Sequence, residues 1–170
     1  QRMQGVGLRH AKLAAFGSTR HFQNPLEKDA NLQALLAAKT QAITIFGKSW
    51  DIHVTDALRI GLEDNLTIIE DSLAFLRPQV EHLLYDAEHF FDGFKANREY
   101  CLATLQRALA GGAETVILCD TNGGTLTHEL AGIIQAVQQF FQQKGQEVRL
   151  GIHAHNDAEC AVANSLMAIQ

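Results

Sequence analysis

The sequence TVILCDTNGG, residues 115–124, contains a short apolar run followed directly by polar residues and two glycines. The run Thr115 to Cys119 is rich in β-branched and aliphatic residues and too short for a buried helix, so it predicts a strand. It lacks polar alternation, as is typical of a parallel sheet with both faces covered. Asn122, Gly123 and Gly124 then predict a tight turn that lets a ligand approach the backbone.

The same pattern of apolar run, polar or glycine-containing loop and helix occurs along the whole chain. The other apolar runs are 12–16 (KLAAF), 42–46 (AITIF), 82–85 (HLLY) and 148–152 (VRLGI). The segments between the runs have helical periodicity, so strands and helices alternate at intervals of roughly 30–40 residues. This alternation predicts about five βα units around a parallel sheet.

Three segments between the predicted strands carry helix signals. Apolar residues recur at steps of three and four across 54–76, which predicts one helix there. A second stripe across 130–141 is followed by Gly145 at the expected end of a helix. Asn97 is expected to cap a third helix, which runs to glycines 111–112.

Two further helix signals lie near the N-terminus. The order Asn24-Pro25-Leu26-Glu27 fits an N-cap, a first-turn proline and a capping-box glutamate. Gln1 is expected to lie within a helix that precedes the first strand. The chain also stops at Gln170 inside a predicted helix, without a cap or stop signal. Both ends are therefore expected to be cut ends of an interior piece.

Five βα units admit two architectures. A doubly wound sheet of five strands, as in a non-catalytic flavodoxin-like binding domain, would be complete at this length. A (β/α)8 TIM barrel needs about 250 residues, so this chain would be part of one. Strands in sequential order would indicate the barrel, and a reversed order would indicate the doubly wound sheet. We expect an α/β fold in which residues 1–170 form a single partial barrel domain with two exposed sheet edges.

The composition restricts the class of protein. The 170 residues are 46% hydrophobic and 19% charged, which is typical of a globular domain. The net charge is −5 with scattered lysines and arginines, so no nucleic-acid partner is expected. No apolar run approaches the about 20 residues of a membrane span, so no membrane association is expected. The three cysteines include no C-x-x-C pair, which favours reduced thiols used in core packing in a cytoplasmic protein.

Polar and reactive residues follow every predicted strand. The strand ends are FGSTR (16–20), FGKSW (46–50), DAEH (86–89), DTNGG (120–124) and HAHND (153–157). In parallel α/β folds, functional groups gather at these carboxyl ends. His153 and His155 alternate along one strand, so both point the same way and can grip one divalent cation. An isolated pair of this kind is more often merely hydrogen-bonded, but the other polar strand ends favour the functional interpretation.

These strand ends, taken together, resemble one known enzyme family. The matching stretches are AFGSTR, TIFGKSWDIHVTDALR, YDAEHFFDGFKAN, LCDTNGGTL and GIHAHNDAECAVANSL. They are similar to the α-isopropylmalate, homocitrate and citramalate synthases, metal-dependent TIM-barrel acyltransferases related to the hydroxymethylglutaryl-CoA lyases. The likeness is strongest to the citramalate synthase type, where DAEHFFDG and LCDTNGG occur together. It covers nearly the whole chain and implies that the predicted strands are barrel strands 3 to 7.

The resemblance implies a divalent metal cofactor, Mg, Mn or Zn. The family's H-x-H pair supplies two ligands, which are His153 and His155 in this chain. The other ligands are an aspartate after the first strand, next to a catalytic arginine, and commonly an asparagine from the eighth strand. This chain contains neither strand, so we expect half a metal site and no activity from the 170 residues alone. Asn156 and Asp157 are expected to cap the next helix or brace the histidines, and Asp120 suits a structural role as well as a site role.

Further site residues follow from the same resemblance. Glu88 matches the family's acid/base glutamate, with a solvated loop glutamate as the plain alternative. Thr121 matches the threonine whose hydroxyl binds the carboxylate of an α-keto acid. Asp86, Lys48 and Arg20 are further candidates for contacts with substrate, the two cations with its anionic groups.

The implied reaction is a Claisen-type condensation of acetyl-CoA with an α-keto acid, first of all pyruvate, giving citramalate. The metal would polarise the keto group, and Glu88 would help to form the enolate of acetyl-CoA. Alternatives on the same scaffold are 2-isopropylmalate or homocitrate synthesis and a retro-aldol lyase. The full-length enzyme is expected to be a cytoplasmic homodimer in isoleucine or leucine biosynthesis.

Overall fold

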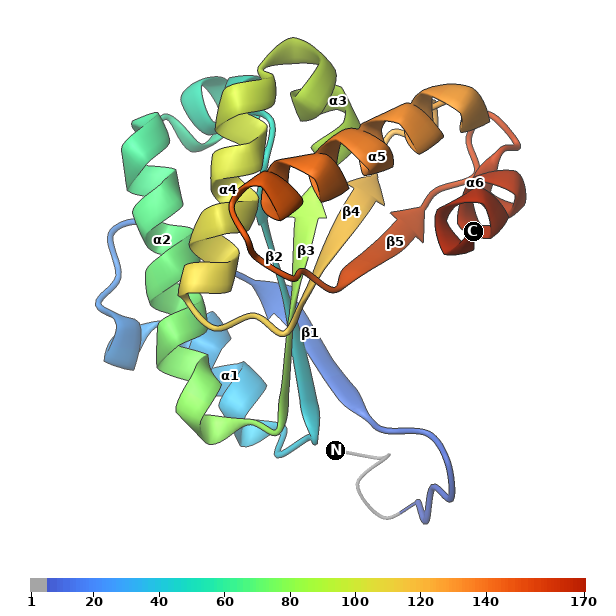
Figure 1. Cartoon of the computed structure of the whole chain (residues 1–170). Helices are drawn as coiled ribbons and strands as arrows, with labels where there is room; N and C mark the ends of the chain where they lie inside the picture. Colours follow the sequence, from blue (N-terminus) through green and yellow to red (C-terminus); the bar gives the residue numbers. More distant parts are fainter. Residues whose placement is uncertain (1–5) are drawn as a thin grey trace.

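The computed structural model describes residues 6–170 as a twisted parallel sheet packed against helices (Figure 1). The strands are β1 (Ala14–Ser18), β2 (Ala42–Lys48), β3 (His82–Glu88), β4 (Thr115–Asp120) and β5 (Leu150–Ala154). The helices are α1 (Ala30–Ala37), α2 (Leu62–Leu76), α3 (Phe90–Ala96), α4 (Arg98–Ala110), α5 (Thr127–Gln143) and α6 (Ala161–Ile169). Two short 3-10 helices, η1 (Leu26–Lys28) and η3 (Arg77–Gln79), and a π-helical segment, η2 (His53–Leu58), lie between them.

The spatial order of the strands is the same as their order in the sequence, β1-β2-β3-β4-β5, and every neighbouring pair is parallel. The predicted strands are therefore confirmed, with bounds that differ by a few residues. A doubly wound sheet would reverse direction and place a later strand on the outer side of an earlier one. Sequential order is that of an arc of a (β/α)8 barrel, so the partial barrel is confirmed and the flavodoxin-like alternative is wrong.

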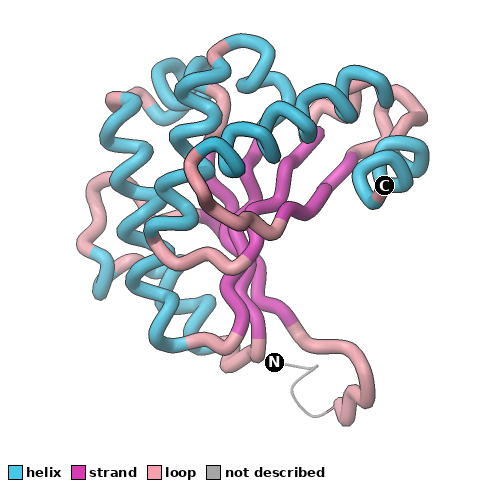
Figure 2. The backbone as a smooth tube through the Cα atoms, in the orientation of Figure 1, coloured by secondary structure: helices cyan, strands magenta, loops and turns pink. Residues whose placement is uncertain are grey.

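The helices cover one face of the sheet and leave the other face bare (Figure 2). Side chains alternate between these faces, so every second residue of a strand enters the core beneath the helices. Ile45 and Tyr85 are fully buried there, whereas Phe16 on the bare face is 59% exposed. The core under the helices includes Leu32, Ile45, Leu73, Tyr85, Phe91, Leu105, Leu118 and Phe141. The bare face corresponds to the interior of a complete barrel and is called the open face below.

The single helix predicted across 54–76 is wrong, because the chain breaks within that range. The segment η2 is π-helical, Arg59 adopts the left-handed conformation with φ 58°, and α2 begins only after Gly61. The residues on the two sides of the break nevertheless share one buried surface. Val54 of η2 and Leu66 of α2 belong to the same small buried cluster. The apolar periodicity across 54–76 therefore indicated residues that are buried together, and not one continuous helix.

Some of the predicted helix ends are wrong and others are confirmed. Asp29, and not Asn24, caps α1: its carboxylate accepts two first-turn N–H groups at 3.1 Å each, while Asn24 precedes only the short η1. Asn97 caps α4 as predicted, by accepting the N–H of Tyr100 at 3.2 Å. Gly145 follows α5 with φ 66°, also as predicted. The helix expected at Gln1 would begin in residues 1–5, which lie outside the described residues, and residues 6–13 contain no helix.

The sheet is open at both sides. Within residues 6–170, β1 and β5 each pair with only one strand, which matches the two exposed edges that were expected. In the described part of the chain, no helix combines the length and the hydrophobicity that crossing a membrane requires.

Candidate active site

The carboxyl ends of the strands bring most of the predicted site residues onto the open face. In the register of the sheet, Lys48 lies opposite Glu88, and Cys119 lies opposite His153. Asp86 shares the face of Glu88, because the two are alternate residues of β3. A cavity of about 230 Å³ at these strand ends is lined by Phe16, Phe46, Asp86, Glu88, Cys119, Thr121, His153 and His155. The predicted residues Asp86, Glu88, Thr121, His153 and His155 therefore meet in one cavity.

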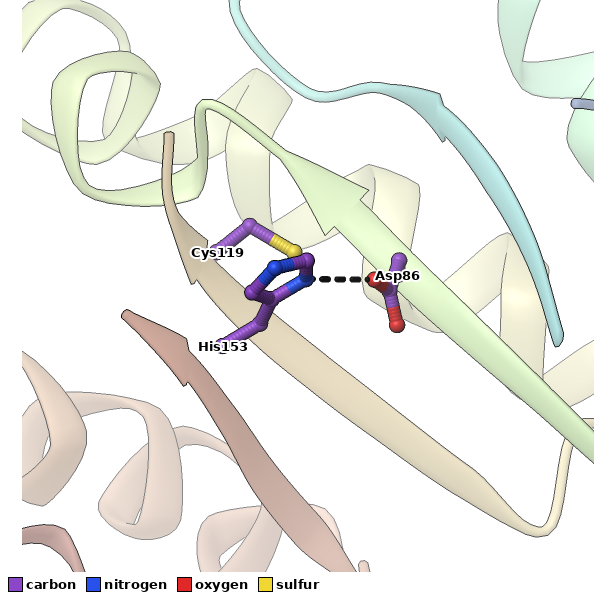
Figure 3. Close-up of side chains that lie close together, drawn as sticks. All are labelled: Asp86, Cys119 and His153. Carbon is purple, nitrogen blue, oxygen red and sulfur yellow. Dashed lines mark hydrogen bonds and ion pairs between the residues drawn. The ribbon is translucent and has the colours of Figure 1, made fainter. Parts of the chain in front are cut away.

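His153 and Asp86 make a direct polar contact across this cavity (Figure 3). The Nδ1 atom of His153 lies 2.9 Å from Oδ2 of Asp86, and the two side chains are 46% and 6% exposed. Cys119 lies near both, with one ligand atom of each residue within 4.8 Å of the others. Burial, reinforced by the charge of Asp86, raises the pKa of the Cys119 thiol, which is therefore protonated at neutral pH. The ring of His155 borders the same cavity, with its centroid 5.0 Å from that of His153.

Glu88 forms an ion pair with Lys48. The Nζ–Oε2 distance is 2.5 Å, and the side chains are 23% and 25% exposed. Charge-assisted hydrogen bonds of this kind are about twice as strong as neutral ones, so each side chain restricts the position of the other. The pair places one carboxylate and one ammonium group at the edge of the cavity.

Thr121 links the loop after β4 to the loop after β3. Its Oγ1 accepts the backbone N–H of His89 at 2.9 Å, which leaves its own hydroxyl hydrogen free to donate to a ligand. His89 has φ 56°, a left-handed conformation that is uncommon for a residue other than glycine. Such a conformation persists where the surroundings hold it, and the Thr121 hydroxyl is one of the groups that do so here.

Arg20 lies outside the smaller cavity, in the wall of a second cavity of about 880 Å³. Its guanidinium pairs with Asp71 at 3.3 Å and donates to backbone carbonyl groups of the following loop, including that of Phe22 at 3.0 Å. Much of its hydrogen-bonding capacity therefore holds the loop between β1 and α1. Phe46 lines both cavities, and Lys48 lines the larger one, so the two cavities adjoin.

Other polar residues at the strand ends stabilise loops. Asp120 is 1% exposed, and its carboxylate accepts the N–H and the hydroxyl of Thr125 at 3.2 and 2.8 Å. The side-chain oxygen of Asn156 accepts the first N–H of α6 at 3.1 Å, which agrees with the helix-capping role expected for it. Gly123 has φ 60°, and a Cβ atom there would lie 2.5 Å from a carboxylate oxygen of Asp157. These contacts fix the β4–α5 and β5–α6 loops around the cavity.

A cluster of three rings beside Glu88 was not predicted from the sequence. The ring centroid of His53 lies 4.4 Å from that of His89 and 4.9 Å from that of Trp50. Burial is the main cause that lowers the pKa of His53, the charges of His89 and Lys48 act in the same direction, and two nearby carboxylates oppose them. The only signal in the sequence was that Trp50 and His89 follow strands.

The cavity contains part of the donor set that a divalent metal requires. His153 and His155 offer imidazole nitrogens, and Asp86 offers a carboxylate beside them. Imidazole and carboxylate groups suit Zn and Mn, and carboxylates suit Mg. Catalytic zinc sites use three protein ligands, so a metal held at the imidazole pair would need further ligands.

Comparison with known proteins identifies the family. A family model described as HMGL-like matches residues 15–170. The (R)-citramalate synthases of Aquifex aeolicus and Geobacter sulfurreducens are 50% and 52% identical over 169 and 162 residues, which is 99% and 95% of this chain. The chain covers only 31% and 30% of those two proteins, and so spans about a third of the curated relatives it matches.

The crystal structure of hydroxymethylglutaryl-CoA lyase from Pseudomonas aeruginosa is similar in fold. It gives a TM-score of 0.71 at 16% identity, and the match covers 97% of this chain and 52% of the lyase. Its fold agrees with the sequential parallel strands described above. As the resemblance in the strand-end motifs implied, this chain belongs to the HMGL-like family.

Proposed function

We propose that this chain forms part of an enzyme that condenses acetyl-CoA with an α-keto acid, here pyruvate. Water then hydrolyses the thioester of the condensation product, which gives citramalate and free CoA. The observation that carries the proposal is the small cavity in which Glu88, Thr121 and the paired histidines meet. The 50% and 52% identity to proteins named (R)-citramalate synthase supports this reaction above the other reactions of the family.

The residues of the cavity have separate roles in this proposal. His153 and His155 hold a divalent metal, which when bound polarises the keto group as a Lewis acid. Thr121 donates its hydroxyl hydrogen to the substrate carboxylate, since its oxygen already accepts the His89 N–H. Glu88 takes the proton from the methyl group of acetyl-CoA, and Lys48 keeps the carboxylate in place at 2.5 Å.

One wall of the cavity is aromatic. The rings of Phe16 and Phe46 stack at 5.6 Å between centroids and form one wall of the cavity. This wall offers an apolar contact for the methyl group of the proposed pyruvate. The adjoining cavity of about 880 Å³, with Lys48 and Arg20 in its wall, is the proposed place for the acyl-CoA.

The test is an assay of CoA-thiol release with a panel of α-keto acids, with and without Mn²⁺, in the full-length enzyme that carries this segment. His153→Ala is expected to abolish the metal-dependent release. The control is His128→Ala, because His128 is an exposed histidine in the first turn of α5, away from the cavity. Full activity of the His153 variant would contradict the assignment of the ligand.

The same panel separates the alternatives. A preference for a branched or dicarboxylic keto acid would indicate 2-isopropylmalate or homocitrate synthesis. A retro-aldol lyase would release no CoA thiol with any keto acid of the panel, because it breaks a carbon–carbon bond and leaves the thioester intact. We propose in addition that the 170 residues alone are inactive, that the full-length enzyme is a homodimer, and that it acts in the cytoplasm. Turnover by the isolated 170-residue chain would overturn the first of these.

A further inference from the structure

Asp86 is a buried carboxylate with few available partners. Its side chain is 6% exposed, its Oδ2 lies 2.9 Å from Nδ1 of His153, and the Cys119 thiol interacts with the same carboxylate. An ionised carboxylate only accepts hydrogen bonds, so this contact requires a proton on Nδ1. A neutral imidazole carries one ring proton, which leaves Nε2 with a free lone pair.

We infer that Asp86 is a positioning residue that holds His153 in the Nδ1–H tautomer and so directs Nε2 into the cavity as the metal-binding atom. This rests on the proposed function in one respect, namely that His153 is a metal ligand. Histidine ligands commonly donate their second N–H to a carboxylate, which fixes the ring orientation and makes the other nitrogen a better ligand. In this role Asp86 acts through His153.

The contact depends on a small residue between the two partners. Asp86 is on β3 and His153 is on β5, with β4 between them, so the two strands are roughly 9–10 Å apart across the sheet. Both side chains must lean over β4 to reach 2.9 Å, and they do so over Cys119, which is opposite His153 in the register. A bulkier side chain at position 119 would separate them.

The same three residues could instead bind a cation together, and the geometry argues against this. The Cys119 side chain is buried, and its thiol lies beside the carboxylate and the imidazole, with one ligand atom of each residue within 4.8 Å of the others. The Nδ1 atom of His153 already faces Asp86, so a cation among the three would have to displace that proton. The positioning role requires no change in the arrangement.

The first experiment reads the tautomer of His153 directly, in the metal-free full-length protein. The protein is labelled with ¹⁵N-histidine, studied by magic-angle-spinning NMR above about pH 8, and the His153 signals are assigned from their loss in His153→Ala. We expect a protonated Nδ1 and an unprotonated Nε2 in the wild type, and loss of this preference in Asp86→Ala. A wild-type His153 with its proton on Nε2 would overturn the inference. Because no substrate is present, this result does not depend on the proposed reaction.

The second experiment measures Mn²⁺ affinity by electron paramagnetic resonance in the same variants. Asp86→Ala is expected to weaken binding by about 10–100-fold, the usual effect of losing such a partner. Cys119→Ala is expected to bind Mn²⁺ like the wild type, whereas Cys119→Leu should weaken it as Asp86→Ala does. Asp86→Asn preserves the shape of the side chain and guards against a variant that fails to fold; it should also lose the tautomer preference. Unchanged Mn²⁺ affinity in both Asp86 variants, or a loss of affinity in Cys119→Ala, would overturn the positioning role.

Discussion

Two glycines inside helices are expected to respond in opposite ways to the same substitution. A Cβ atom at Gly93 of α3 would lie 2.5 Å from the carbonyl oxygen of Ser49 and 3.0 Å from the Cα of Trp50. Ordinary van der Waals contact begins at 3.4 Å, and these neighbours are backbone atoms that no change of rotamer can move aside. At Gly132 of α5 a Cβ atom would meet nothing within 4 Å.

The expected magnitudes follow from these distances. Overpacking costs about 1–3 kcal/mol, and a collision with backbone belongs at the upper end of that range. Replacing glycine by alanine within a helix gains about 0.5–1 kcal/mol in either case. Gly93→Ala should therefore lower the free energy of unfolding by about 2 kcal/mol, and Gly132→Ala should raise it by about 0.5–1 kcal/mol.

Urea unfolding followed by far-UV circular dichroism measures both free energies. Trp50 is the single tryptophan of the sequence, so its fluorescence reports separately on the neighbourhood of Gly93. The emission of the folded state should change in Gly93→Ala and stay the same in Gly132→Ala. The disturbance should also reach the site, because the N–H of Ser49 donates to the carbonyl of Glu88 at 3.1 Å. Effects of the same sign at the two glycines would refute the reasoning.

Three further predictions concern stability and reactivity. Asn97→Ala removes the cap of α4 and should lower the free energy of unfolding by about 1 kcal/mol in the same urea experiment. An unchanged free energy of unfolding would contradict the capping role. Burial lowers the pKa of His53 below its ordinary 6.5, so protonation favours the unfolded state and stability should fall as the pH drops below 6.5. His53→Gln should weaken that dependence, measured by unfolding at about pH 7.5 and 5.5; an unaltered slope would contradict the assignment. Burial raises the pKa of the Cys101 and Cys119 thiols, so in the native protein a disulfide reagent at about pH 8 should modify Cys160 first, and quick labelling of all three would contradict their burial.

The strands could be predicted from the sequence because their signal is local. Runs such as 42–46 and 115–119 are short, β-branched and bounded by polar or glycine-containing segments, which leaves few alternatives to a strand. Two facts about parallel sheets then place the site: carboxyl ends of strands lie at one rim, and alternate residues share a face. These facts suffice to bring Glu88, His153 and His155 to one cavity.

Contacts that depend on the orientation of a side chain or on the path of a loop could not be predicted from the sequence. The position of Arg20 after β1 made it a candidate for contact with substrate, which stays a prediction, but the ion pair of its guanidinium with Asp71 on α2 could not be predicted from that position. Asp86 was selected as a contact for substrate, which stays a prediction. Its contact with His153 crosses an intervening strand, and the spacing of the two residues in the sequence does not indicate it. Cys119 was expected to serve core packing, and only the register of β4 against β5 places it in the cavity.

The end of β4 shows why the core and the site of this fold depend on the same register. Leu118 and Asp120 face the helices, where one is buried in the core and the other holds the following loop through Thr125. Cys119 and Thr121 alternate with them and line the cavity. A slip of one residue between β4 and its neighbours would move an aliphatic side chain to the cavity and a cavity residue into the core. The hydrophobic core therefore does more than stabilise the sheet: by specifying the register, it also determines which polar side chains reach the cavity.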